Sequence, residues 1–154
     1  MNSCSYRADI DGLRAVAVLS VVLYHFGIGG LRGGFVGVDV FFVISGYLIT
    51  GIVYSELVRG NFSLAQFYVR RARRIFPALF VVLILTMIAG SYVLLPSDLA
   101  RLGLSSAATV LFVSNLQYFR ESGYFDASSE FNPLLHTWSL GVEEQFYFAL
   151  PVLL

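Results

Sequence analysis

The chain has 154 residues, of which 57% are hydrophobic and 13% carry a charge. Soluble domains carry about 25% charged residues, so this chain lacks the charge to cover a water-facing surface, and its composition is typical of a protein in a lipid bilayer. The formal net charge is zero, which gives no indication of a nucleic-acid partner. Cys4 is the only cysteine, so a disulfide within the chain is excluded.

The first apolar segment, near residues 13–28, holds two residues that are rare in membrane helices, Arg14 and His25. They are eleven residues apart, so a helix would place both on one face, roughly 16 Å apart along its axis. A histidine can act as general base on a hydroxyl group, and Arg14, with Asp11 three residues before it as a partner, can hold an anion. The alternative is that Arg14 only reaches the lipid headgroups and His25 lies at the outer interface. No small-residue cleavage site follows His25, so we predict a retained span and not a signal peptide.

The second apolar segment, near residues 34–54, is long enough to span a bilayer and contains Asp39. An aspartate inside a span is costly unless it faces a partner or water. A structural pairing and a functional role are equally compatible with this position. The glycines around it, including Gly33 and Gly37, predict close helix packing in preference to ligand contact.

Residues 55–77 are predicted to form a cytoplasmic loop that ends in the sequence FYVRRARRIFP. Four arginines lie close together there, namely Arg70, Arg71, Arg73 and Arg74. Guanidinium groups bind phosphate bidentately, so this loop is a candidate anion site. The alternative is equally physical, since a basic loop also attracts anionic lipid and fixes the topology.

Three further apolar segments follow, and we predict a span in each. They lie near residues 78–95, 99–119 and 139–154. The first opens after Pro77, a residue favoured at a helix start. The second is rich in serine, threonine and asparagine, which predicts that it packs inside a bundle. The third is still apolar at Leu154, so we expect the chain to be the N-terminal part of a longer domain.

The last span is entered through the sequence HTWSLGVEEQFY, which starts at His136. Ser139 is a candidate helix cap, and a tryptophan such as Trp138 is ordinary at a membrane interface. Carboxylates early in a helix suit its dipole, but two adjacent glutamates, Glu143 and Glu144, are unusual at the entry to hydrocarbon. We therefore retain all five as candidate site residues.

No metal site is predicted. A set of His25, His136, Asp39 and a glutamate is conceivable, but no ligand-spacing rule supports it. A serine-hydrolase elbow, a P-loop and a cysteine–histidine cluster are also absent from the sequence.

The distribution of arginines predicts the orientation. With a cytoplasmic N-terminus, eight arginines lie inside (Arg7, Arg14, Arg59, Arg70, Arg71, Arg73, Arg74 and Arg120) and two outside (Arg32 and Arg101). This asymmetry satisfies the positive-inside rule. We therefore predict an all-α, polytopic transmembrane helix bundle with about five spans in the inner (plasma) membrane.

Read together, four segments resemble the acyltransferase-3 family of integral membrane acyltransferases, with the bacterial lipopolysaccharide and peptidoglycan O-acetylases as the nearest likeness. The segments are YRADIDGLRAVAVLSVVLYH at 6–25, GGFVGVDVFFVISGYLIT at 33–50, FYVRRARRIFP at 67–77 and HTWSLGVEEQFY at 136–147. They occur in the family's order and cover most of the chain. The family's fold implies roughly twice as many spans as are present here.

The resemblance implies transfer of an acetyl or other acyl group from cytoplasmic acetyl-CoA to a hydroxyl of a surface polysaccharide or its lipid-linked sugar precursor. It gives His25 the catalytic histidine role and makes Arg14 the arginine of the same motif. Arg71 and Arg74 match an Arg-x-x-Arg element associated with the acyl donor, with Arg70 and Arg73 beside them. Two other classes stay open: an inactive structural remnant, and a proton-coupled transporter, for which intramembrane ionisable residues are also suited.

Overall fold

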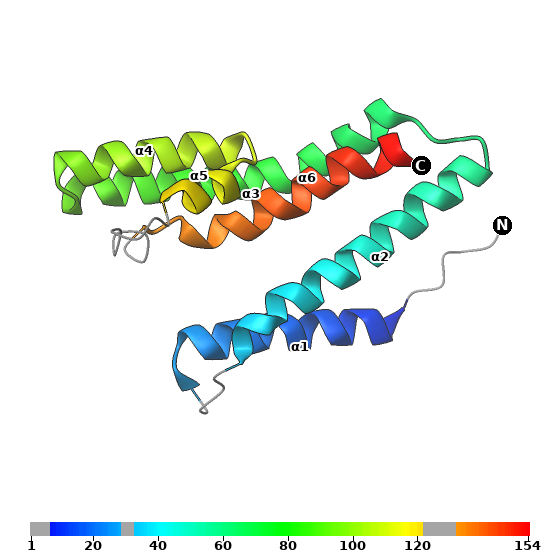
Figure 1. Ribbon diagram of the computed structural model, residues 1–154, viewed down its shortest axis with the longest axis horizontal. Helices are drawn as coiled ribbons and strands as arrows, with labels where there is room; N and C mark the ends of the chain where they lie inside the picture. Colours follow the sequence, from blue (N-terminus) through cyan, green and yellow to red (C-terminus); the bar gives the residue numbers. More distant parts are fainter. Residues whose placement is uncertain (1–6, 29–32, 122–131) are drawn as a thin grey trace. The chain divides into compact units, whose positions relative to one another are not determined.

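The computed structural model describes residues 7–28, 33–121 and 132–154 (Figure 1). Within these ranges the chain is helical and contains no strand, which confirms the all-α prediction. Two of the described helices, Gly34–Val58 and Leu64–Val93, are long and apolar enough to cross a bilayer. The chain divides into two compact units, Met1–Glu56 and Leu57–Leu154.

The first unit consists of two helices joined at a close contact. Helix α1 (Ala8–His25) is followed by the 3-10 turn η2 (Gly34–Val36) and by α2 (Gly37–Val58). A Cβ atom added at Gly34 would lie 2.4 Å from the carbonyl oxygen of Ser20, and one at Gly37 would lie 2.4 Å from that of Ala17. Glycine is therefore required at both positions by the backbone of α1, and the predicted packing role of Gly37 is confirmed.

Gly33 differs from the expectation. A Cβ atom there meets nothing within 4 Å, so the second packing glycine is Gly34 and not Gly33. The register of η2 explains the difference, because Gly34 and not its neighbour turns toward α1. From this contact α1 and α2 diverge (Figure 1).

The second unit begins with α3 (Leu64–Val93), which includes the four clustered arginines and Pro77. The prediction that residues 55–77 form a loop is therefore wrong for most of its length. Ser63 caps the helix by accepting a hydrogen bond from the backbone N–H of Gln66, and strong helix formers follow. Pro77 lies inside this helix and not at its start, where the sequence suggested it. Spanning helices tolerate the loss of the backbone hydrogen bond that a proline removes.

The segment predicted as a single span at 99–119 is broken into α4 (Pro96–Val110) and α5 (Ser114–Glu121). Phe112 ends α4 with a φ of 55°, the left-handed conformation that closes many helices. The chain then reverses, and the Gln117 side chain of α5 donates a hydrogen bond back to the Ser105 hydroxyl of α4. The two helices therefore form a hairpin, and neither has the length of a span.

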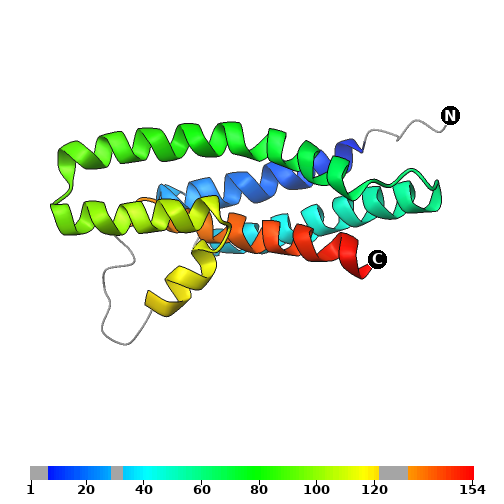
Figure 2. The same cartoon turned by 90° about the horizontal axis from the view of Figure 1, so that it is seen from above.

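The unit closes with the 3-10 turn η4 (Leu135–Thr137) and α6 (Trp138–Leu153). Figure 2 shows α4 and α6 running in the same direction and opposite to α3. The core of the unit packs residues from α3, α4 and the turns beside them, namely Leu79, Leu83, Leu102, Phe112 and Leu134.

Candidate functional site

Arg14 lies on α1 with contacts to both helices of the first unit. Its Nη1 atom is 4.0 Å from the Asp11 carboxylate, which confirms the predicted pairing across three residues. Its guanidinium carbon lies 5.3 Å from the centroid of the Phe41 ring on α2, within the range of a cation–π contact. Arg14 is partly buried by these neighbours.

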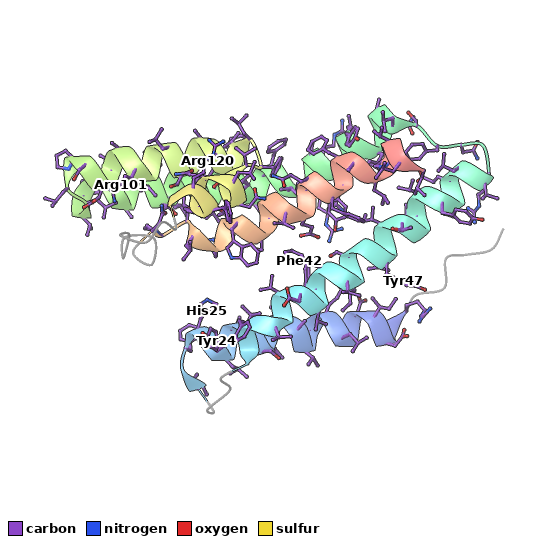
Figure 3. The ribbon with its side chains drawn as sticks, in the orientation of Figure 1. Tyr24, His25, Phe42, Tyr47, Arg101 and Arg120 are labelled. Carbon is purple, nitrogen blue, oxygen red and sulfur yellow. The ribbon has the colours of Figure 1, made fainter. Side chains whose placement is uncertain are left out.

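His25 is the last residue of α1, and Figure 3 shows it beside Tyr24 at that end of the helix. Its Nδ1 atom lies 2.8 Å from the carbonyl oxygen of Val21. A carbonyl can only accept a hydrogen bond, so this contact favours the tautomer that carries a proton on Nδ1. The side chain is exposed.

Asp39 lies in the first turn of α2 and is exposed. The partial positive charge at a helix N-terminus stabilises a carboxylate in this position. The two alternatives that the sequence allows for Asp39, a structural pairing and a functional role, both stay predictions.

The most deeply buried ion pair in the described part of the chain joins α3 to α6. Arg71 Nη2 lies 3.0 Å from Glu144 Oε1, and the two side chains are only 14% and 6% exposed. The guanidinium carbon of Arg71 also lies 3.7 Å from the centroid of the Tyr147 ring. The Tyr147 hydroxyl donates a hydrogen bond to Glu143 one turn earlier in α6. We call these four residues, Arg71, Glu143, Glu144 and Tyr147, the α3–α6 clamp.

The clamp explains why two adjacent glutamates can enter an apolar helix. A carboxylate is costly to bury unless it is paired and hydrogen-bonded. Glu144 is paired with a cation, and Glu143 accepts from a buried tyrosine. Removing either partner of a buried ion pair costs about 3–5 kcal/mol because the other charge is left uncompensated.

The structure divides the four predicted arginines of the anion site into two sets. Arg71 is held in the clamp, whereas Arg70, Arg73 and Arg74 are exposed on α3. The predicted group is therefore brought together along one helix, but only three of its members present their side chains at the surface.

Aromatic contacts extend the junction toward the N-terminus of α3. The Tyr68 ring stacks on Phe148 with centroids 5.1 Å apart, and the Tyr68 hydroxyl donates to the Phe148 carbonyl at 3.0 Å. Sequence reasoning did not assign a role to Tyr147 or Tyr68. The available signal was the spacing of Tyr147 from Glu143, since residues four apart are neighbours on a helix.

The residues at the entry to α6 lie around η4. His136 and Trp138 are exposed, and Ser139 donates a hydrogen bond to the His136 carbonyl at 3.1 Å. The prediction that Ser139 caps the helix is wrong, because η4 continues directly into α6 and Thr137 occupies the cap position. The Thr137 hydroxyl instead lies 2.9 Å from that of Thr109, in the buried interior.

A polar network ties the α4–α5 hairpin to α6. The Gln145 and Asn115 side-chain amides exchange two hydrogen bonds, at 2.9 and 3.1 Å. Gln145 also donates to the Phe112 carbonyl at 2.8 Å, where α4 ends. A Cβ atom at Gly141 would lie 3.0 Å from the Asn115 oxygen, so α5 and α6 pack closely there. Thr109, Ser114 and Asn115 of the segment 99–119 thus find hydrogen-bond partners inside the unit, in agreement with the packing that its composition predicted.

Among the described residues, no group of three histidine, cysteine, aspartate or glutamate side chains is placed to hold a metal ion.

Two long apolar helices and a buried ion pair are typical of a helical membrane protein. A family model described as an acyltransferase domain matches residues 7–154. The chain therefore belongs to the acyltransferase-3 family of membrane acyltransferases, as its motifs predicted.

Its relatives include named O-acetyltransferases. The peptidoglycan O-acetyltransferase OatA of Listeria monocytogenes is 42% identical over 154 residues, covering 99% of this chain and 25% of the relative. The O-acetyltransferase OatA of Staphylococcus aureus (strain NCTC 8325 / PS 47) is 38% identical over 155 residues, covering 100% of this chain and 26% of the relative. A protein of S. aureus strain MSSA476, whose name assigns it provisionally as an O-acetyltransferase, is 44% identical over 152 residues, with coverages of 97% and 25%.

The chain thus spans about a quarter of the length of these relatives. No solved structure matches it.

Proposed function

We propose that this protein is a membrane O-acyltransferase that moves an acetyl group from cytoplasmic acyl-CoA to a sugar hydroxyl of a cell-surface glycan or its lipid-linked precursor. The observation that carries the proposal is the likeness over nearly the whole chain to a peptidoglycan O-acetyltransferase. Peptidoglycan is accordingly the acceptor that we favour.

In this proposal His25 is the general base. Its Nε2 atom accepts the proton of the sugar hydroxyl while that oxygen attacks the thioester carbonyl. A carbon–oxygen bond forms, the carbon–sulfur bond breaks, and the CoA thiolate leaves and takes up a proton. The hydrogen bond from Nδ1 to Val21 supports this role, because it favours the tautomer that leaves Nε2 unprotonated.

The phosphates of the donor require cations at the cytoplasmic face. Arg70, Arg73 and Arg74 are exposed together on α3 and are suited to this contact. Arg14 lies on the same helix face as His25 by helical geometry, and its charge is suited to the polar part of the donor. We propose no metal in this reaction.

We place the N-terminus in the cytoplasm and the protein, as a multi-pass chain, in the inner membrane. With α3 leaving the cytoplasm, α6 returns to it, since the two helices are antiparallel (Figure 2). The crossing helices are then α1, α2, α3 and α6, and the α4–α5 hairpin enters from the outer side.

The test uses the longest product of the gene in membranes supplied with labelled acetyl-CoA. We expect label to enter glycan with the wild-type protein and to fall by at least about a hundredfold with His25→Ala, the scale of general-base catalysis. Phe26→Ala is the matched control, because it removes an exposed ring from the adjacent position without removing a base. Wild-type transfer rates from a well-inserted His25→Ala protein would refute the assigned role.

A further inference from the structure

The clamp separates two roles within the arginine cluster. We propose that Arg71 is a positioning residue that fixes the rotation of α3 against α6, and that Arg74 is the arginine of the Arg-x-x-Arg element that contacts the acyl donor. This assignment rests on the proposed function, and it gives the adjacent glutamates of α6 a role in that reaction.

The contacts of Arg71 leave little of its guanidinium for a phosphate. One amino group is bonded to Glu144, and one face of the plane lies on the Tyr147 ring. The Nε atom is buried and has no hydrogen-bond partner among the described residues. A phosphate that reached Arg71 would enter the field of the Glu144 carboxylate in a region shielded from water, where like charges repel strongly.

Arg74 differs from Arg71 in its exposure to solvent, although its charge also acts on Glu144. It is exposed and lies about 60° around α3 from Arg71 and one turn along the axis. Arg70 is also exposed, and the two residues are only about 40° apart, so they share a face of the helix. A pair of guanidinium groups one turn apart is suited to bidentate binding of phosphate.

The clamp sets the direction in which this pair points. The α3–α6 junction is restrained at two points one turn apart, by the ion pair at Arg71 and by the Tyr68–Phe148 contact. Two such contacts restrain the rotation of α3 about its axis. Loss of the ion pair therefore misdirects Arg74 without removing its charge.

A double-mutant cycle in the longest product of the gene tests this assignment. The variants are Arg71→Gln, Glu144→Gln and the two combined, with Arg74→Gln beside them and Arg101→Gln, an exposed arginine of α4 (Figure 3), as the matched control. The measurements are the KM for acetyl-CoA, the dissociation constant of labelled CoA, and the melting temperature in detergent. Loss of folded enzyme lowers Vmax but leaves KM unchanged, so KM reports on positioning.

We expect Arg74→Gln to raise the KM for acetyl-CoA and the dissociation constant of CoA about tenfold each, which corresponds to the loss of one charge-assisted hydrogen bond. The melting temperature should not change. Each clamp variant should lower the melting temperature and raise KM, because one buried charge is left alone. The combined variant should recover most of both losses, because no uncompensated charge remains. The control should match the wild-type protein.

The assignment is overturned if the combined variant binds CoA as weakly as Arg74→Gln, since Arg71 would then contact the donor itself. It is also overturned if the two clamp substitutions are additive in melting temperature. Binding of CoA without acetyl transfer by the wild-type protein would reject the proposed reaction and leave this assignment standing. Absence of CoA binding would reject both.

Discussion

At the scale of single residues, Tyr147 makes two contacts in the clamp that substitution can separate. Its ring lies under the Arg71 guanidinium, and its hydroxyl donates to Glu143. The ring contributes a cation–π contact worth about 2 kcal/mol when desolvated. Without the hydroxyl, a partly buried carboxylate loses a donor, which costs about 1–3 kcal/mol.

Substitution separates these two contributions. Tyr147→Phe keeps the ring and should lower the free energy of unfolding by about 1–3 kcal/mol. Tyr147→Leu should cost more, because it also removes the cation–π contact and part of the packing of a residue that is 2% exposed. Denaturation of the detergent-solubilised protein measures both, with the exposed Tyr92→Phe as control. Equal losses in the two Tyr147 variants would show that the ring contributes nothing beyond the hydroxyl.

The residue-scale contacts also show which pairs sequence can predict. Asp11 and Arg14 are three residues apart on one helix, so their pairing follows from helical spacing alone. Arg71 and Glu144 are 73 residues apart, and their pairing depends on how α3 and α6 pack. Sequence reasoning identified Arg71 and Glu144 as unusual but assigned Arg71 to the binding of an anionic ligand. It could not predict the ion pair, because a buried partner on another helix leaves no local pattern in the sequence.

At the scale of elements, the approach of η2 and α2 to α1 depends on two glycines. Alanine normally stabilises a helix relative to glycine by about 1 kcal/mol. At Gly37 the added methyl group would lie 2.4 Å from a backbone oxygen of α1, which cannot move aside as a side chain can. Overpacking of this kind costs about 1–3 kcal/mol, so the clash should outweigh the gain in propensity.

We therefore expect Gly37→Ala to lower the melting temperature, and Gly34→Ala to do the same. Gly33→Ala provides the matched control, since its methyl group meets nothing within 4 Å. Thermal unfolding of the three variants in detergent measures the effect. A destabilised Gly33→Ala protein beside an unchanged Gly34→Ala protein would instead support Gly33 as the second packing glycine, as the sequence alone suggested.

Element boundaries were harder to predict than element type. Hydropathy found the apolar segments, but it could not show that α3 extends back through the arginines, because charged residues in a helix and in a loop look alike on a hydropathy scale. The break at Phe112 was missed for another reason. A left-handed phenylalanine carries no turn signal of the kind that glycine or asparagine gives, and the packed ring, 9% exposed, holds it in place.

At the scale of the whole molecule, the α4–α5 hairpin changes the membrane topology. A span at 99–119 would carry the chain across the bilayer, and Arg120 would then join the cytoplasmic arginines. In the structure α4 ends before Phe112 and Gln117 of α5 bonds back to Ser105, so α5 does not continue the direction of α4 and Arg120 belongs to the hairpin. Seven of the ten arginines would still lie inside without it, so the positive-inside rule remains satisfied.

Cysteine labelling in intact cells distinguishes the two topologies. Cys4 is the only cysteine, so Cys4→Ser provides a clean background for single replacements. With a cytoplasmic N-terminus, Ser97→Cys at the start of α4 and Arg120→Cys in α5 should both react with a membrane-impermeant maleimide. Arg59→Cys, in the exposed turn between α2 and α3, should react only after the cells are opened. Protection of Arg120→Cys in cells where Ser97→Cys is labelled would mean that residues 99–119 cross the bilayer, and the hairpin would then be excluded in the membrane.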